Sequence, residues 1–428
     1  MTEILGIIQC LLISLICYLE FKNKSSAVFL WATLLIMFGV MHLITSINGD
    51  FEYNNIVLQN ASIFVIIFCM FYFSIRVLTS YKNSLYIYIK TNFNDIVGHN
   101  KSCDRLLFFI LLCIGLWRIW SMIWYADGIL NTSWATMRSY SNTLNYMNFN
   151  QLFTIIFFSL SGLPLLFALK KERLLCLYSV LLILLNVLIT RNRIEILPIF
   201  CSFIALFIIK TQKLSLKTII YGSVIAFIVI FLIYSLRVFR HYGSISAFIS
   251  EFNFGTFTCK VLEYIATGNG ELGLRRVFYY FLACNNDFPG FGEGASYIRM
   301  LLVFIPTRWS LGLKPDDFAI IMGSAIGMGP GGSTHPTLFG DCFANLGMYG
   351  VLLGIFWGIY ATSMDYITIK RKTKTGQVLL FVLNCVTYCI IGRGSVYNAF
   401  FICAWGISLI VLFEFIFIKF LRRLHFYI

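Results

Sequence analysis

The chain has 428 residues, of which 59% are apolar and only 12% are charged. Soluble proteins carry about 25% charged residues, so this chain lacks the charge that a water-exposed surface requires. The composition excludes a soluble enzyme, a nucleic-acid-binding module and a disordered protein, although a formal net charge of +14 would suggest nucleic acid in a soluble chain.

Apolar runs follow one another along the chain, each roughly long enough for a helix to cross ~30 Å of hydrocarbon. They predict an all-α polytopic integral membrane protein of about eleven transmembrane helices, at 4–20, 26–44, 56–75, 106–126, 150–169, 174–190, 194–209, 218–236, 337–362, 376–391 and 396–418. Eight of these spans fall in residues 1–236 and three in 337–428. Between them, 237–336 forms one large loop.

Two features of the predicted spans concern their packing. Gly350, Gly354 and Gly358 repeat every four residues, so one face of the ninth span is expected to allow close backbone packing. Pro164 and Pro198 are expected to kink their spans.

The loop 237–336 divides into two parts by composition. Its opening carries apolar residues at helical spacing, which predicts a helix lying on the membrane surface. Five of the seven prolines of the chain follow in its later part, which is therefore predicted to be ordered but not helical.

Basic residues set the expected orientation. The loops at alternate ends of the predicted spans, together with the C-terminal tail, hold 20 of the 33 lysines and arginines. Cytoplasmic loops carry such an excess, so the N-terminus is expected outside and the C-terminus in the cytoplasm. The large loop is then extracytoplasmic.

Thirteen basic residues lie on the outer side of this topology, and eleven of them are arginines, whereas the inner side has 14 lysines and 6 arginines. Topology requires only charge, but a guanidinium binds phosphate or carboxylate through two parallel hydrogen bonds. The excess therefore favours anion binding over arginines that only reach lipid headgroups. The outer basic residues are Arg118, Arg138, Arg191, Arg193, Arg237, Arg240, Arg275, Arg276, Arg299, Arg308 and Arg393, with Lys260 and Lys314.

Three predicted spans begin at the outer face with a cation or an imidazole. Arg191 and Arg193 stand immediately before the seventh span. His335 stands before the ninth span, and Arg393 stands before the last. Because helix N-termini offer unpaired N–H groups and a partial positive charge, we expect these residues to form a receptor for pyrophosphate.

Arg118 lies about two-thirds of the way through the fourth predicted span. An arginine near mid-membrane costs at least ~2.5–3.5 kcal/mol, and such residues are usually functional and face the bundle interior. The alternative is an ion pair that joins two helices, with Glu195 or Asp341 as the partner.

Three outward residues are candidates for acid–base chemistry: His335, Glu195 and Asp341. Histidine has the most suitable unperturbed pKa, although a single loop histidine is often incidental. Glu195 would alternatively neutralise Arg193, and Asp341 would alternatively cap its helix.

No metal or other cofactor is expected. Most cysteines lie within apolar runs, where thiols behave as small hydrophobes, and no metal-ligand spacing is visible. The acidic pair Asp50 and Glu52 lacks a third ligand, so it is expected to be solvated loop.

The run from His335 through Asp341 to Val351 resembles the span that follows the large external loop of Wzy-type O-antigen polymerases. The turn that carries Arg191 and Arg193 is similar to that family's arginine between two central spans. The layout of about eleven helices with one large external loop also matches.

This resemblance implies a GT-C-like membrane glycosyltransferase at the outer face of the bacterial inner membrane. It would polymerise undecaprenyl-pyrophosphate-linked oligosaccharide repeat units into O-antigen or a related surface polysaccharide. Its partners would be that lipid-linked oligosaccharide, the lipid bilayer and a chain-length regulator protein, and no nucleic acid. O-antigen ligases share the class and use an external histidine, whose counterpart would be His335.

In this hypothesis, preorganised cations stabilise the charge that grows on the leaving pyrophosphate, and His335 or Glu195 deprotonates the acceptor hydroxyl. An O-antigen ligase, a lipid-linked oligosaccharide flippase and a non-enzymatic transporter remain alternatives. The proposed pyrophosphate- and glycan-binding residues are Arg118, Arg138, Arg191, Arg193, Arg237, Arg240, Arg308 and Arg393.

Overall fold

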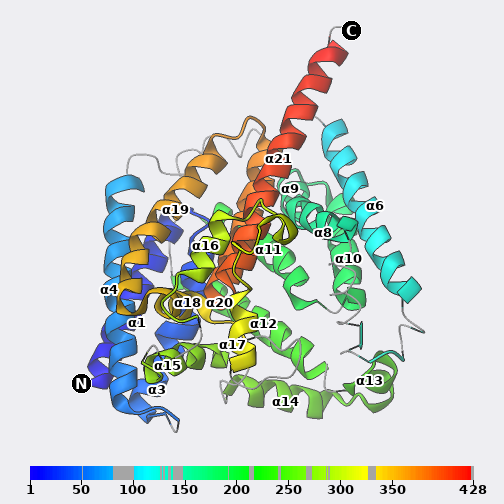
Figure 1. Cartoon of the computed structure of the whole chain (residues 1–428). Helices are drawn as coiled ribbons and strands as arrows, with labels where there is room; N and C mark the ends of the chain where they lie inside the picture. The colour runs from blue at the N-terminus through cyan, green and yellow to red at the C-terminus, as the bar shows by residue number, and fades with distance from the viewer. Residues whose placement is uncertain are drawn as a thin grey trace. The chain divides into compact units, whose positions relative to one another are not determined.

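The structure is a computed structural model that describes residues 1–50, 52–80, 101–125, 128, 131–133, 136–137, 148–190, 192–211, 216–239, 242–266, 272–285, 287, 290–325 and 334–425. All regular secondary structure in these residues is helical (Figure 1). Nine helical segments of this described part are long and apolar enough to cross a membrane, which supports the predicted polytopic fold. They are Thr2–Lys22, Val28–Asn48, Asn55–Thr79, Cys103–Trp124, Gln151–Leu169, Arg173–Thr190, Thr337–Ile369, Lys374–Arg393 and Val396–Ile416.

Contacts divide the chain into two compact units that are each discontinuous in sequence. Unit 1 comprises Met1–Tyr88, Gly270–Lys370 and Asn384–Trp405. Unit 2 comprises Ile89–Asn269, Arg371–Leu383 and Gly406–Ile428. The loop 237–336 is thus shared between the two units, with its opening in unit 2 and its later part in unit 1.

Unit 1 joins the N-terminal helices to those on either side of residue 337. Its helices are α1 (Thr2–Lys22), α2 (Val28–Leu34), the π-helix η1 (Leu35–Val40), α3 (Met41–Asn48), α4 (Asn55–Ser80), η5 (Leu272–Leu274), α15 (Arg275–Ala283), α16 (Ala295–Leu301), η6 (Thr307–Trp309), α17 (Phe318–Ala325), α18 (Thr337–Leu346), η7 (Gly347–Leu352) and α19 (Leu353–Ile369). The second half of α20 (Lys374–Arg393) and the beginning of α21 (Val396–His425) also belong to it.

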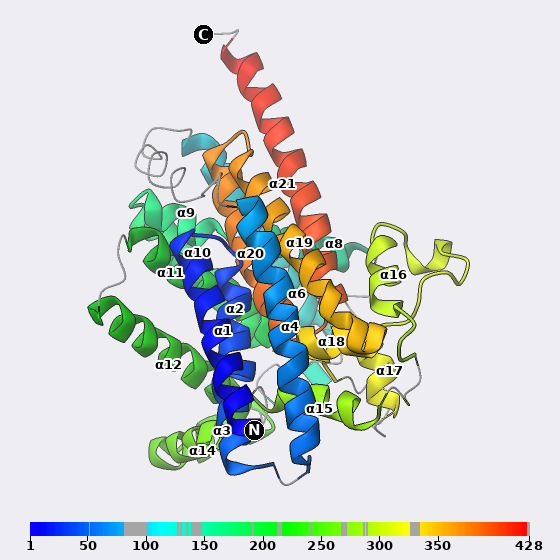
Figure 2. The same ribbon diagram turned by 90° about the vertical axis from the view of Figure 1, so that its left-hand side faces the viewer.

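Two parallel helices of unit 1, α4 and α19, pack backbone against backbone (Figure 2). A Cβ atom at Gly354 would lie 2.4 Å from the carbonyl oxygen of Phe68. One turn later, a Cβ atom at Gly358 would lie 3.0 Å from the Cβ of Ile75. The glycine face of α19 is therefore what permits this close approach, as the glycine spacing predicts.

Helix α15 is part of the core of unit 1, although it comes from the large loop. Tyr279 is fully buried, and its hydroxyl lies 2.5 Å from Nδ1 of His42 on α3. His42 in turn contacts the hydroxyl of Ser62 on α4 through Nε2, at 2.7 Å. Phe278 is also fully buried, and its ring meets the rings of Phe38, Phe64, Phe339 and Phe343.

The prediction that the later part of the loop is not helical is therefore wrong, because α15, α16 and α17 form there. The prolines of this part that the structure describes stand between helices and not inside them. Pro306 precedes η6, and Pro315 precedes α17. Proline disrupts a helix interior but not the connection between two helices.

Unit 2 contains the predicted spans of the middle of the chain and the opening of the loop. Its helices are α6 (Lys101–Tyr125), α8 (Asn148–Leu160), α9 (Leu163–Leu169), α10 (Arg173–Thr190), η3 (Arg193–Ile196), α11 (Leu197–Lys210), α12 (Leu216–Phe239), α13 (Ile245–Glu251) and α14 (Phe254–Ala266). The last two confirm a helical opening of the loop, as two helices separated at Asn253, whose side chain accepts a hydrogen bond from the backbone N–H of Thr256.

Prolines begin helices at two places where the sequence predicts kinked spans. Pro164 stands in the first turn of α9, after a break that separates this helix from α8. Pro198 stands in the first turn of α11, which has only 14 residues and follows the short helix η3. Proline has no helical hydrogen bond to lose in a first turn, so each span starts anew there.

Candidate functional site

Arg118 on α6 and Glu195 in η3 form a buried ion pair in unit 2. The Nη2 atom of Arg118 lies 2.6 Å from Oε1 of Glu195, and the Nη1 atom of Arg118 lies 3.2 Å from Oε2. The side chain of Arg118 is 6% exposed and that of Glu195 is fully buried. Of the two open interpretations of Arg118, the structure thus gives it the helix-joining ion pair, with Glu195 as the partner.

The same carboxylate also holds the turn between α10 and η3. Thr190 donates its hydroxyl to Oε2 at 3.2 Å, and Asn192 donates its amide to Oε1 at 3.3 Å. Both oxygens of Glu195 therefore already accept two hydrogen bonds. A general base must reach the proton that it abstracts, whereas both oxygens of Glu195 already bind groups of the protein. This geometry therefore favours a structural role, in which Glu195 orders Arg118 and the turn.

His335 and Arg393 belong to neighbouring segments of unit 1. Arg393 ends α20, and the two residues Gly394 and Ser395 connect it to α21. The imidazole of His335 lies against this connection, because a Cβ atom at Gly394 would be 3.7 Å from its Cγ and 3.9 Å from its Nδ1. Both side chains are partly exposed. The structure thus brings together two of the helix-start residues that the sequence singled out.

The backbone directly after His335 is strained. Thr337 begins α18 with a φ of +66°, and a β-branched residue is a clear outlier in this left-handed region. Such conformations cost about 1–3 kcal/mol and cluster at active sites and switch regions. The strained conformation of Thr337 therefore supports a functional role for the segment that leads from His335 into α18.

Two further cations, which the sequence did not select as site residues, lie beside the start of α21. The guanidinium carbon of Arg299 is 4.3 Å from the ring centre of Tyr397, and the ammonium of Lys314 is 5.5 Å from it. Tyr397 is four residues after Arg393. None of the ion pairs found among the described residues involves Arg299 or Lys314. The start of α21 is therefore a place where two cations converge on one aromatic ring.

The sequence places these two cations on the outer side but does not indicate that they lie together. Arg299 and Lys314 both belong to the excess of outer basic residues. Their convergence on one aromatic ring of a distant helix depends on how the loop folds back, which no local pattern encodes.

Asp341 joins the loop to α18 and does not cap that helix. Its Oδ2 atom accepts a hydrogen bond from the hydroxyl of Ser296 at 3.0 Å, and its Oδ1 atom accepts one from the amide of Asn345 at 3.2 Å. Asn345 also accepts the backbone N–H of Ser296 at 3.0 Å. All three residues are buried, so they fix α16 against α18.

Several other outer basic residues have partners inside the protein. In unit 2, the guanidinium of Arg237 on α12 lies 5.2 Å from the ring centre of Tyr264 on α14. In unit 1, Arg275 donates to the carbonyl of Leu272 at 2.6 Å and to the hydroxyl of Thr45 at 3.0 Å. These arginines attach loop helices to the spans.

Arg276 pairs with the two acidic residues that were expected to be solvated. It lies 3.6 Å from a carboxylate oxygen of Asp50 and 3.7 Å from one of Glu52. The side chain of Asp50 is only 2% exposed. The expectation of a solvated acidic loop is therefore wrong for Asp50, because α15 covers it.

The remaining predicted site residues have no described side chain. Arg138, Arg191 and Arg240 lie outside the described residues. For Arg193 in η3 and Arg308 in η6, only the backbone is described.

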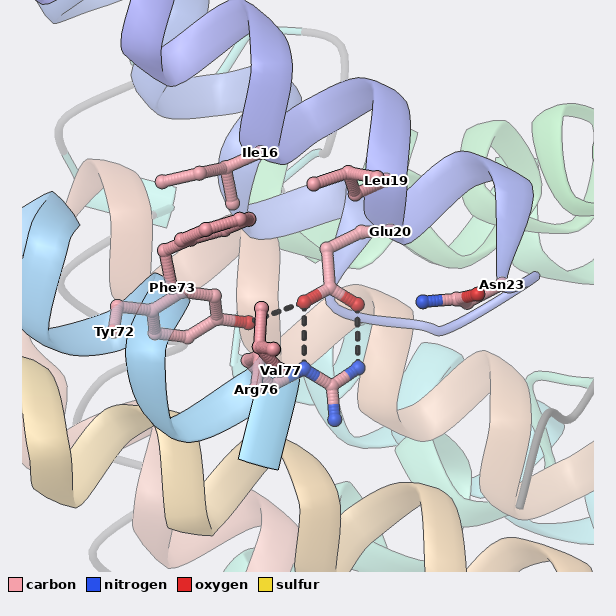
Figure 3. A pocket seen from close by; sticks show the side chains of 8 residues that line it. All are labelled: Ile16, Leu19, Glu20, Asn23, Tyr72, Phe73, Arg76 and Val77. Carbon is pink, nitrogen blue, oxygen red and sulfur yellow. Dashed lines mark hydrogen bonds and ion pairs between the residues drawn. The ribbon is translucent and has the colours of Figure 1, made fainter. Parts of the chain in front are cut away.

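A second ionic cluster of unit 1 lies at the C-terminal end of α4, around a small pocket (Figure 3). Arg76 holds both carboxylate oxygens of Glu20, at 2.6 and 2.5 Å, and also contacts Asp365 at 2.8 Å. Tyr72 donates its hydroxyl to Glu20 at 2.9 Å. Figure 3 shows Tyr72 and Arg76 converging on this carboxylate.

This cluster ties α1, α4 and α19 together, and its arginine is fully occupied. Because these charged groups already bind one another, we regard the cluster as a structural clamp. Arg76 is one of the 20 basic residues that the predicted orientation places in the cytoplasmic loops and tail. Its role could have been suspected because Glu20, Arg76 and Asp365 each stand near the end of an apolar run.

Comparison with known proteins gives no match: no family model, no curated protein and no solved structure is significantly similar to the chain.

Proposed function

We propose that the chain is a membrane glycosyltransferase that polymerises undecaprenyl-pyrophosphate-linked oligosaccharide units into O-antigen or a related surface polysaccharide, at the outer face of the bacterial inner membrane. The single observation that carries the proposal is the position of His335 against the connection between α20 and α21, immediately beside Arg393. An imidazole beside an arginine, near a ring on which two further cations converge, suits a reaction that needs a base and releases an anion.

In the proposed reaction, His335 accepts the proton of the acceptor sugar hydroxyl. The hydroxyl oxygen bonds to the anomeric carbon of the donor, and the bond from that carbon to the pyrophosphate oxygen breaks. The bonding electrons leave with the pyrophosphate, whose negative charge therefore grows in the transition state. Histidine is the usual residue for such proton transfer near neutral pH, and general base catalysis contributes about 10²–10⁴-fold in rate.

Arg393 is the proposed contact for the leaving pyrophosphate, with Arg299 and Lys314 adding to the positive field around Tyr397. Cations that are fixed before the reaction stabilise a developing anion more than the ground state. The positions of Arg299 and Lys314 are set by the loop, since each also bonds to a backbone carbonyl, that of Pro315 and that of Ile305 respectively.

Within unit 2, we propose Arg138, Arg191, Arg193 and Arg240 as further anion-binding residues, and within unit 1 we propose Arg308. Arg118 and Glu195 would act as positioning residues in unit 2, because their ion pair and the bonds to Thr190 and Asn192 fix the start of η3, which carries Arg193.

Cells that depend on this chain for surface polysaccharide provide the test. We expect His335→Ala and Arg393→Lys to reduce long glycan chains to single capped units, while the protein accumulates normally in the membrane. The matched control is Arg276→Lys, which changes an outer arginine whose partners are the carboxylates of Asp50 and Glu52 and should leave chain length unchanged. Normal long chains in both site variants would exclude these two residues from the reaction.

An O-antigen ligase would use the same histidine and cations but would attach finished polymer to a lipid A core. The single capped unit distinguishes the two enzymes, because loss of a ligase leaves the polymer on its lipid carrier. A flippase or transporter would show neither product, since it forms no glycosidic bond.

A further inference from the structure

A strongly apolar surface lies on the segment 301–313, which follows α16 in unit 1. Arg308 is the only charged residue among these thirteen positions. The exposed fraction is 85% for Leu301, 76% for Trp309 and 91% for Leu311. Phe304, Ile305 and Leu313 are exposed as well.

The opposite side of this segment is polar and buried. Lys314 is 8% exposed, and its ammonium donates to the carbonyl of Ile305 at 2.8 Å. Ser310 is 5% exposed and donates its hydroxyl to the carbonyl of Thr307 at 2.8 Å. A loop in water exposes its polar groups, so this arrangement is the reverse of that of a soluble loop.

The backbone of the segment forms several hydrogen bonds within itself. Trp309 donates its N–H to the carbonyl of Pro306 at 2.9 Å, and Leu313 donates to Ser310 at 2.8 Å. Ile305 donates to Leu302 at 3.1 Å. Backbone groups that enter a membrane must find such partners inside the protein, so the segment meets much of this requirement.

The apolar surface continues the face that α19 and the helix before it present outward. Tyr349, Leu352, Phe356 and Ile359 are all exposed, and their spacing puts them on one side of the span Thr337–Ile369. The ring of Tyr297 on α16 contacts that of Phe356, with 6.0 Å between the ring centres. The segment therefore begins beside a face of unit 1 that membrane lipid would cover.

The segment 301–313 contacts α21 well inside that helix, beyond its first turn. The ring of Phe304 lies 5.3 Å from that of Trp405. Trp405 comes nine residues after Val396, the first residue of α21, which is about 14 Å along a helix. Figure 2 shows α16 and the turn after it projecting sideways from the helices of unit 1.

We propose that the segment 301–313 is a re-entrant element whose exposed apolar side chains are inserted among the acyl chains of the bilayer that the spans cross. An exposed apolar patch of this kind marks an interaction surface. The continuity with the outward face of α19 identifies the occupant as lipid hydrocarbon, and Trp309 provides the amphipathic ring typical of membrane interfaces. This inference does not depend on the proposed enzymatic activity.

Tryptophan fluorescence of the full-length protein tests the proposal in phosphatidylcholine vesicles whose acyl chains carry bromine, a contact quencher. The spectrum of the wild type minus that of Trp309→Phe isolates Trp309. The matched controls are Trp124→Phe, which removes a 76% exposed ring at the end of a predicted span, and Trp31→Phe, which removes a fully buried ring.

We expect the Trp309 component to be quenched by bromolipid at least as strongly as the Trp124 component, and aqueous iodide to leave it unchanged. Quenching by iodide alone would overturn the proposal, because it would place the segment in water. Protection from both quenchers would also overturn it, because protein or a second copy of the chain would then cover the surface. The double variant Trp309→Phe with Leu311→Trp moves the reporter by two residues and must give the same result.

Discussion

The buried pair of Arg118 and Glu195 permits one prediction that can be worked through from the structure. The variant Glu195→Ala leaves the guanidinium of Arg118 in a site where its side chain is only 6% exposed. Breaking a buried pair from one side typically costs about 3–5 kcal/mol, because the remaining charge is uncompensated. At 1.36 kcal/mol per factor of ten, the folded state should lose a factor of about 10² to 10⁴ against the unfolded state.

Removing both charges should restore most of this loss. In the double variant Arg118→Met with Glu195→Leu, no charge is stranded, and similar apolar replacements elsewhere have been neutral or stabilising. Thr190 keeps a partner, because its hydroxyl also donates to the carbonyl of Asn186 at 2.8 Å. Asn192 is partly exposed and has access to water. We therefore expect the double variant to fall within about 1–2 kcal/mol of the wild type.

The free energy of unfolding of the full-length protein in bicelles, measured by steric trapping, provides the assay. The matched control is Glu52→Ala, since Glu52 pairs with Arg276 near the surface at 3.7 Å and such pairs contribute only about 0–1 kcal/mol. A double variant as unstable as Glu195→Ala would refute the reasoning. If the double variant recovers stability but cells that carry it still lack long glycan chains, the pair has a positioning role beyond stability.

Three further predictions concern packing and pH. Gly354→Ala should destabilise the protein by about 1–3 kcal/mol, because its Cβ would lie 2.4 Å from the carbonyl oxygen of Phe68. Gly222→Ala is the control, since the nearest atom to a Cβ there would be 3.9 Å away. Equal melting temperatures of the two variants would contradict the close contact at Gly354. Phe278→Ala should cost about 3–5 kcal/mol and increase amide hydrogen exchange throughout α15, and unchanged exchange there would mean that α15 is not a core helix. Burial and the carboxylates of Glu52 and Asp50 raise the pKa of Tyr53 to about 12, above its usual value near 10. The folded state then holds this proton longer, so stability falls as pH rises from about 10 to 12, and the fall should be smaller in Tyr53→Phe.

Hydropathy was sufficient to predict where most spans lie. Nine of the eleven predicted spans correspond to long apolar helices in the described residues, because the length of an apolar run directly sets whether a helix can cross hydrocarbon. The glycine spacing on α19 was equally readable, since a four-residue repeat of glycine has one geometric consequence on a helix.

Breaks within spans and the structure of the loop were harder to predict. Pro164 and Pro198 were predicted to kink their spans, but the structure places both in the first turn of a helix. Whether a proline kinks a helix or begins a new one depends on whether the preceding residues end a helix. Proline content suggested an irregular loop, yet Phe278 and Tyr279 pack into unit 1 and stabilise α15 through tertiary contacts. Propensity is a weak guide when such contacts decide the fold.

The candidate site was predictable in its residue types but only partly in its contacts. His335 and Arg393 were found from their places before helices, and the structure brings their segments together. The partner of Arg118 was one of two alternatives, and burial of Glu195 decided it. Arg299 and Lys314 were missed because their shared contact, Tyr397, lies more than eighty residues away in sequence.

The most direct test of the proposed chemistry is the rate of glycosidic bond formation by purified protein in vesicles supplied only with lipid-pyrophosphate-linked repeat units. We predict polymer from the wild type, a loss of at least about 100-fold for His335→Ala, and little additional loss when Arg393→Lys is combined with it, because residues of one catalytic unit are not additive. Formation of polymer at the wild-type rate by the double variant would contradict the account.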